Sequence, residues 1–389
     1  MRVVELTAYQ VRIPLRRVIR HATFVRTATD NIVVRCRLSD GVLGWGEGVP
    51  REYVTGETIE TALAALRDAG LPSQLPPWSD LPEAVQLAER ITLPALPGDT
   101  RGIRNHAARC AVELALLDAA TQSAGVPLSA VTPLVAPDLA VHRDRVQYSG
   151  AIASADGWRL RAIAWAYRLY GFAQVKVKVG IDGQDDVARL RAIRRRLGPR
   201  VQIRVDANEA WSARDAADRI QSLEPFRLSS IEQPIPHEQV AALSEIRRNV
   251  STAIMLDESL CGTIDAEHAI RNRLCDAFNL RLSKCGGFIP TLRLAQLARR
   301  NGITYQLGCQ VGETAILSAA GRHWAASVDG WTAIEGSFDR HLVGATLADR
   351  DITFGRGGWA PALDRPGLGI SVQADAVDRL TVRSESLLG

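Results

Sequence analysis

The sequence lacks the features of a membrane, secreted or zinc-ribbon protein. No apolar run approaches the length that spans a bilayer, and the opening "MRVVELTAYQVRIPLRR" has no apolar core of signal-peptide length. The six cysteines are scattered without CxxC spacing, which argues against a zinc ribbon or a disulfide framework. These absences predict a soluble protein of the reducing cytoplasm.

The sequence also lacks the high net charge typical of nucleic-acid or membrane-surface binding and the glycine-rich loop typical of nucleotide binding. A net charge of +4 over 389 residues gives no electrostatic case for nucleic acid or an anionic membrane. The arginine-rich stretch "RLRAIRRRLG" has helical spacing, which is typical of a solvated helix face. No glycine-rich phosphate loop follows an early strand, so the sequence disfavours a doubly wound nucleotide-binding sheet. We expect neither nucleic acid nor a membrane as a partner.

The chain changes its organisation near residue 145. Before that point, "VVELTAYQVRIPL" and "TDNIVVRCRLSDGVLGWGEG" predict antiparallel strands, and "NHAARCAVELALLDAATQSAG" predicts a long helix that ends at Gly125. From "RVQYSGAIAS" onward, eight strand-like runs alternate with helical patterns, and such a series closes naturally into a (β/α)8 barrel of the TIM type. We therefore predict an α/β fold with three parts. They are an α+β capping domain at 1–140, a (β/α)8 barrel at 141–345 and a C-terminal segment at 346–389 that returns to the capping domain.

Ionisable residues recur at the ends of the predicted strands, about one βα unit apart. They are Lys178, Asp206, Glu232, Asp257, Lys284 and Glu313, with successive spacings of 28, 26, 25, 27 and 29 residues. The carboxyl ends of the strands form the rim where chemistry occurs in this barrel. The pattern therefore predicts an active site at that rim, although any one acid alone is equally explained as a helix cap or an ion-pair partner.

Three of these acids follow successive strands and can converge on one cation. Neighbouring strands lie roughly 4.8 Å apart, so Asp206, Glu232 and Asp257 can share one oxygen-ligated ion. Mg²⁺ suits such a site because it takes a few carboxylates and keeps positions open for substrate oxygens. Asn208 shares the face of Asp206 and is expected either behind the ligands or facing the substrate.

The stretch "QVKVKVG" places Lys176 and Lys178 on one face of a strand whose other face carries valines. Two like charges on one face are not buried without counter-charges. We expect them to face a cavity that holds the carboxylates and a dication. Lys284 follows the sixth strand of the series, so it is predicted on the other side of the barrel mouth.

Five motifs, "KVK", "DAN", "EQP", "LDES" and "SKCGG", resemble the enolase superfamily in their order and spacing, and within it the muconate lactonizing enzyme subgroup often discussed with mandelate racemase. The resemblance covers essentially the whole chain. In this superfamily a Lys or His base works with Mg²⁺. The resemblance implies that Asp206, Glu232 and Asp257 bind Mg²⁺, with Mn²⁺ as a substitute. It also implies that Lys178 and Lys284 are the catalytic lysines, with Lys176 as the partner of Lys178.

The activity implied by the resemblance is removal of the proton alpha to a carboxylate through an enediolate intermediate. The enzyme is then a racemase or epimerase, or a cycloisomerase, of a small carboxylate such as an N-substituted amino acid, a dipeptide or a muconate-like acid. A syn-dehydratase of a hydroxy acid is the alternative. A non-catalytic ligand-binding barrel is disfavoured because all three acids are present. We also expect a homo-oligomer.

Substrate selection is expected from loops of the capping domain. "RHATFVRTATDN" carries Arg26, and "EGVPREYVTGET" carries Arg51 and Tyr53. Either arginine can pair with a second substrate carboxylate, or be a solvated loop residue. Glu313, in "GETAILSAAG", is expected at the substrate or as an acid at a helix N-terminus.

Dipeptide epimerases of the subgroup usually carry Asp-x-Asp at the eighth strand. The stretch "IEGSFDRHL" has Glu335 and Asp339 instead of such a pair, which argues against dipeptide epimerisation. Lactonisation, racemisation of an N-substituted amino acid and dehydration remain open.

Overall fold

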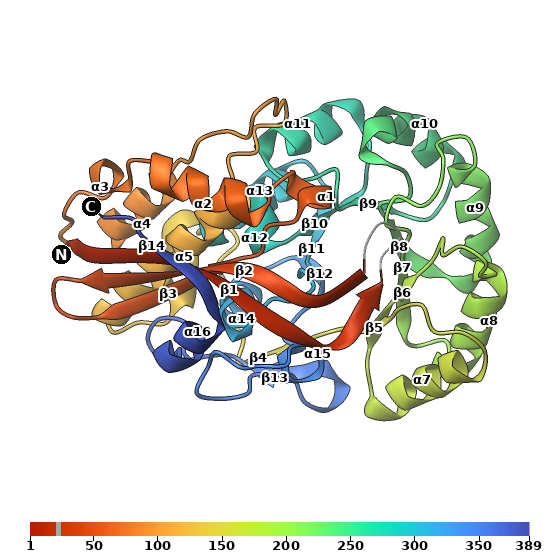
Figure 1. Ribbon diagram of the computed structural model, residues 1–389. Helices are drawn as coiled ribbons and strands as arrows, with labels where there is room; N and C mark the ends of the chain where they lie inside the picture. Colours follow the sequence, from red (N-terminus) through yellow and green to blue (C-terminus); the bar gives the residue numbers. More distant parts are fainter. Residues whose placement is uncertain (21–24, 389) are drawn as a thin grey trace.

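The computed structural model describes residues 1–20 and 25–388, and its two parts lie side by side in Figure 1. The smaller part contains a four-stranded antiparallel sheet in the order β14–β1–β2–β3. Its strands are β1 (Val3–Arg20), β2 (Val25–Leu38), β3 (Leu43–Gly48) and β14 (Thr381–Ser386). The last strand of the chain therefore lies beside the first.

The first 140 residues also form the helices of this part. They are α1 (Glu52–Thr55), α2 (Ile59–Asp68), α3 (Leu71–Gln74), α4 (Leu81–Arg90), α5 (His106–Ser123), η1 (Leu128–Ala130) and α6 (Val131–Val135). The long predicted helix is α5, which is buried along most of its length. Three glycines allow β3 to lie directly on α5. A Cβ atom on Gly44, Gly46 or Gly48 would meet backbone carbonyl oxygens of α5 at 2.3, 2.0 and 1.8 Å.

The larger part is a curled sheet of eight parallel strands in sequence order, which confirms the predicted barrel class. The strands are β5 (Gly150–Ile152), β6 (Gln174–Lys178), β7 (Gln202–Asp206), β8 (Leu228–Glu232), β9 (Ile254–Leu256), β10 (Ala277–Leu280), β11 (Thr304–Leu307) and β12 (Trp331–Ile334). The backbone N–H of Ser149 donates to the carbonyl of Ile334 at 2.9 Å, so the segment before the first strand reaches the last strand.

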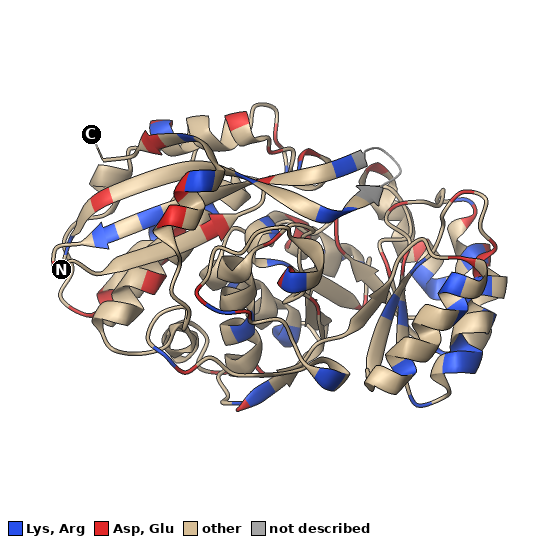
Figure 2. Cartoon of the chain, turned by 60° about the horizontal axis from the view of Figure 1, so that its bottom comes forward, with Lys and Arg blue, Asp and Glu red and all other residues tan. Residues whose placement is uncertain are grey.

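Helices alternate with these strands and form the outer layer (Figure 1). They are α7 (Gly157–Tyr170), α8 (Asp186–Leu197), α9 (Ala216–Leu223), η2 (Glu224–Phe226), η3 (His237–Ala242), α10 (Leu243–Ile246), η4 (Arg247–Asn249), α11 (Thr263–Asn272), α12 (Leu282–Cys285), α13 (Phe288–Arg300) and α14 (Ala315–Ser327). The arginine-rich stretch lies on α8, among the blue helices at the right of Figure 2. None of the described helices combines the length and apolarity needed to cross a bilayer.

One predicted strand divides into two. The stretch "VQYSGAIA" forms β4 (Arg145–Gln147), which pairs with β13 (Trp359–Pro361), and then β5, which begins the barrel. The remaining elements after the barrel are α15 (Asp339–Leu342), η5 (Arg356–Gly358) and α16 (Ala374–Leu380). The division arises because β4 takes a tertiary partner more than 200 residues away, which local periodicity does not reveal.

Two buried carboxylates of the capping domain dock onto the N-termini of barrel helices. Glu113, on α5, accepts the backbone N–H groups of Phe288 at 2.5 Å and Ile289 at 3.0 Å, where α13 begins. Glu47, on β3, accepts the N–H groups of Thr314 and Leu317 at the start of α14. A carboxylate at a helix N-terminus satisfies unpaired N–H groups and complements the helix dipole. These contacts fix how the cap lies against the barrel.

Gly287 provides a test of this docking. Its φ is +133°, and a Cβ atom there would lie 2.1 Å from Oε2 of Glu113. We expect Gly287→Ala to lower the free energy of unfolding by about 3 kcal/mol or more, because a left-handed backbone strain adds to a steric clash. Urea denaturation measures it. The control is Gly302→Ala, with φ +69° and open space around the Cβ position, which should cost only about 1–2 kcal/mol. Equal effects would contradict a special role for the contact with Glu113.

Candidate active site

Lys176 lies at the centre of a buried network at the carboxyl ends of the strands. Its Nζ atom lies 2.9 Å from Glu335, 3.3 Å from Asp206 and 3.5 Å from Glu232. Burial lowers the pKa of Lys176, but Glu232, Glu335 and Asp206 outweigh burial and leave the pKa well above its usual value. Lys176 is therefore a fixed cation that holds carboxylates from three strands together.

Glu232 links this network to a second cation that the sequence analysis missed. Arg281 contacts the Asp257 carboxylate directly, and its Nη2 atom lies 3.6 Å from Oε1 of Glu232. Asn279 also donates to Oε1 of Glu232, at 2.7 Å. The signal was present in "AFNLRL", where Asn279 and Arg281 stand two residues apart, as Lys176 and Lys178 do in "KVK".

The three predicted metal ligands are brought together by these shared cations. Lys176 contacts both Asp206 and Glu232, and Arg281 contacts both Glu232 and Asp257. The strand register agrees, since Lys178 pairs with Asp206 and Asp206 with Glu232.

The donor set fits a hard cation such as Mg²⁺, although the described residues form no ready-made coordination group of three acidic, histidine or cysteine side chains. Burial and the neighbouring Asp206 raise the pKa of Glu232 well above its usual range, while Lys176 acts in the opposite direction. Carboxylates crowded in this way favour an added dication. Arg281 bridges Glu232 and Asp257 beside this donor set.

The other two lysines differ in their surroundings. Lys178 ends β6 and is half-buried, and its ammonium makes no hydrogen bond within the described residues. Lys284 lies beyond β10, in α12, and is fully buried. The Lys284 ammonium donates to the carbonyl and carboxylate of Asp257 at 2.7 and 2.8 Å, and to the carbonyl of Asn279 at 2.9 Å. The sequence contains only these two lysines and Lys176, so every lysine of the chain lies at this end of the barrel.

Asn208 sits behind the carboxylates. Its backbone N–H donates to Asp206 at 3.0 Å, and its side chain donates to Glu258 at 3.3 Å. Burial, followed by repulsion from Asp257 and Asp206, raises the pKa of Glu258 to about 8. The amide of Asn208 thus joins the carboxylate cluster to a further buried acid that the sequence analysis did not single out.

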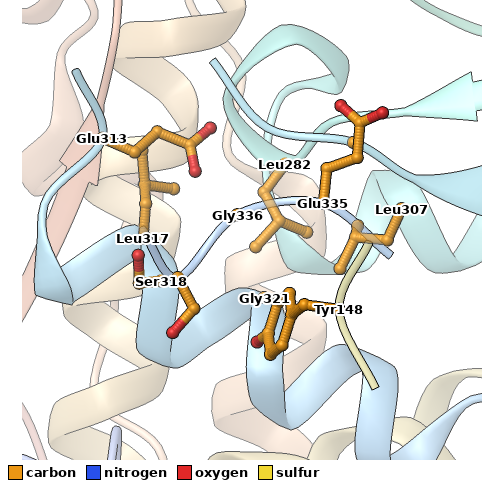
Figure 3. Close-up of a pocket in the computed structure, with 11 residues that line it drawn as sticks. Tyr148, Leu282, Leu307, Glu313, Leu317, Ser318, Gly321, Glu335 and Gly336 are labelled. Atoms are coloured by element: carbon orange, nitrogen blue, oxygen red, sulfur yellow. The ribbon is translucent and has the colours of Figure 1, made fainter. Parts of the chain in front are cut away.

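Glu335 and Glu313 line one small cavity together with residues of α14 such as Leu317 and Ser318 (Figure 3). Glu335 is held by Lys176 and, at 2.6 Å, by Arg204. Burial opposes its ionisation, but the two cations lower its pKa to about 2. Glu313 accepts the N–H of Gln310 at 2.6 Å, and burial raises its pKa to about 8. The eighth strand therefore supplies an anion already bound by protein cations.

The predicted capping-domain residues Arg26 and Tyr53, and Glu313 of the barrel, lie near Arg51. Arg51 is buried and donates to Thr29 and to the carbonyls of Pro50 and Val311, each at 2.7 Å. Burial lowers the pKa of Arg51 to about 10, with Arg26 acting the same way and Tyr53 and Glu313 in opposition. Part of the loop before Arg26, residues 21–24, lies outside the described residues.

Sequence comparison gives two family matches that together cover most of the chain. Residues 3–131 match the mandelate racemase/muconate lactonizing enzyme N-terminal domain, and residues 159–376 match the enolase C-terminal domain-like family. An L-Lys-D/L-Arg epimerase of Methylococcus capsulatus is 33% identical, over 95% of this chain and 99% of its own. An N-succinyl-L-Arg/Lys racemase of Bacillus cereus is 28% identical, over 98% of both chains.

Comparison with solved structures supports the same family. The N-succinyl Arg/Lys racemase of Bacillus cereus superposes with a TM-score of 0.85 at 25% identity, covering 99% of this chain and 100% of its own. A dipeptide epimerase of Cytophaga hutchinsonii, complexed with Mg and D-Ala-L-Val, has a TM-score of 0.84 at 27% identity and full coverage of both chains. The chain therefore belongs to the enolase superfamily, in its mandelate racemase and muconate lactonizing enzyme group, and is an isomerase.

Proposed function

We propose that the protein removes the proton alpha to the carboxylate of a small substrate and isomerises it, with Mg²⁺ or Mn²⁺ held by Asp206, Glu232 and Asp257. The observation that carries this proposal is the linkage of these three carboxylates through shared cations. Beside them lies Lys178, whose side chain has no hydrogen-bond partner in the part of the chain that the structure describes. The Mg in the dipeptide epimerase complex named above supports the choice of ion.

The residues of the site have different roles in this proposal. The dication supplies positive charge where a second negative charge develops on the substrate carboxylate. The neutral amine of Lys178 takes the alpha proton at Nζ and becomes an ammonium. Lys176 keeps Asp206 and Glu232 in place and is itself fixed by Glu335.

The capping domain selects the substrate in this proposal. Arg26, Tyr53 and Glu313 lie close enough to Arg51 to affect its ionisation, which supports placing them around one end of a bound substrate. Arg51 already binds two backbone carbonyls, so we assign it the task of holding the loop before Glu313. The named relatives act on N-succinyl amino acids and dipeptides, and a small carboxylate is the proposed substrate class. A cytoplasmic homo-oligomer remains our prediction.

Loss of Lys178 should abolish proton exchange. In deuterium oxide with Mg²⁺, mass spectrometry should detect solvent deuterium at the alpha carbon of an N-succinyl amino acid or a dipeptide. Lys178→Ala should reduce the rate roughly 10²–10⁴-fold, as expected for a general base. Arg195→Ala, which removes an exposed cation on α8, is the control and should exchange normally. Unchanged exchange in the Lys178 variant would refute the assigned base.

Loss of Glu232 should weaken metal binding. Calorimetry with MgCl₂ should give an affinity at least about 100-fold lower for Glu232→Gln, since even outer-shell changes cost 10–100-fold. The control is Glu238→Gln, which neutralises an exposed acid near the same rim. If both variants bound Mg²⁺ like the parent, the metal site would be misassigned.

A further inference from the structure

The position opposite Lys178 belongs to Arg281. In a closed eight-stranded barrel, the second and sixth strands face each other. Lys178 ends β6, the second strand, and Arg281 directly follows β10, the sixth. Asn279, two residues earlier, donates to Glu232, so alternation directs Arg281 into the barrel as well. Its contacts with Asp257 and Glu232 place the guanidinium beside the proposed metal ligands.

All three N–H donors of the Lys284 ammonium are used within the protein, so this group is not available to a substrate proton. An ammonium group has three N–H donors, and the Lys284 ammonium has three acceptors, two on Asp257 and one on Asn279. Its side chain is 0% exposed, and its carbonyl contacts the ring of His106 at 3.0 Å. Lys284 therefore ties the end of β9 to the end of β10 and is a positioning residue for Asp257.

The low lysine content of the chain supports the same distinction between positions 178, 281 and 284. The sequence has 47 Lys and Arg residues, of which only three are lysines. All the others are arginines, so the three lysines mark positions where a guanidinium does not substitute for an amino group. At position 284 the compact three-donor ammonium fits three buried acceptors, and at position 178 the amine left after loss of a proton can provide a lone pair. Position 281 is served by arginine, a group with five donors and no acceptor.

We propose that the alpha proton is removed and returned on one face only, by Lys178, and that Arg281 covers the opposite face as a donor-only cation. This inference rests on the proposed function. The Cα–H bond breaks, its electron pair stays on the substrate, and the proton moves to Nζ of Lys178. Inversion at carbon needs a proton acceptor on one face and a donor that can be recharged on the other. The isomerisation that a one-faced base permits makes or breaks a bond beta to the carboxylate within the substrate, as in lactone closure or opening.

The first test uses the three lysines and needs no substrate. Native protein is treated briefly with formaldehyde and a borohydride reagent, and methylation at each lysine is followed by peptide mass spectrometry. We expect Lys178 to react more than about 100-fold faster than Lys284, because reaction at Lys284 requires local opening of the structure. Similar rates at both lysines would overturn the assignment of Lys284 as a buried positioning group.

The second test is solvent-deuterium exchange on paired configurations. The probes are N-succinyl-L-lysine with N-succinyl-D-lysine, and L-Ala-L-Glu with L-Ala-D-Glu. The parent protein should exchange one member of a pair. Arg281→Lys should raise exchange of the other member by roughly 10²–10⁴-fold, since it adds a base on that face. Arg271→Lys, an exposed arginine of α11, is the control and should not change the preference.

The outcomes separate this inference from the function on which it rests. Calorimetry with Mg²⁺ first establishes that Arg281→Lys keeps the metal site. Exchange of both configurations by the parent would overturn one-faced chemistry while upholding proton abstraction. A one-sided preference unchanged in a metal-binding Arg281→Lys variant would overturn the placement of position 281. Exchange of neither member of any pair would refute the proposed function itself.

Discussion

The active end of the barrel depends on how buried carboxylates share a few cations. Glu232 is the central group, since it is approached by Lys176, Arg281 and Asn279. Unpaired charges are expensive to bury, so each acid needs a partner from another strand, and removal of one partner leaves another charge uncompensated. The same sharing brings Asp206, Glu232 and Asp257, the proposed metal ligands, together. Structure and proposed chemistry thus rest on one set of contacts.

The capping domain uses carboxylates in a different way. Glu47 and Glu113 contact backbone N–H groups at the starts of α14 and α13 rather than basic side chains. Such contacts need close backbone approach, which Gly287 allows beside Glu113. Because α14 starts just after Glu313, docking of the cap fixes the loop that carries a proposed substrate-facing acid. Arg51 reinforces it through the carbonyl of Val311.

Lys178 and Arg281, which we propose on opposite sides of the metal ligands, are not chemically equivalent. An amine has a lone pair once its proton has left, whereas a guanidinium remains a donor. A barrel can therefore keep the same charge on both sides of its mouth and still have a base on only one of them. Named relatives of this chain are racemases and epimerases, but substrate and stereochemistry are argued from the residues of the site rather than from the fold.

The sequence by itself determined the barrel, its strand order and the positions of the acids, because strand alternation and the length of a βα unit are local properties. It did not determine the division of "VQYSGAIA" between β4 and β5, since β13 is the distant partner of β4. The spacing of the motifs predicts Lys284 at the barrel mouth, and nothing in the spacing singles out Arg281. Only the tertiary structure shows the different surroundings of these two side chains, because the chain leaves the strand after Leu280 and enters α12. Arg281 keeps the inward direction of the strand, and the Lys284 ammonium turns to buried acceptors beneath it.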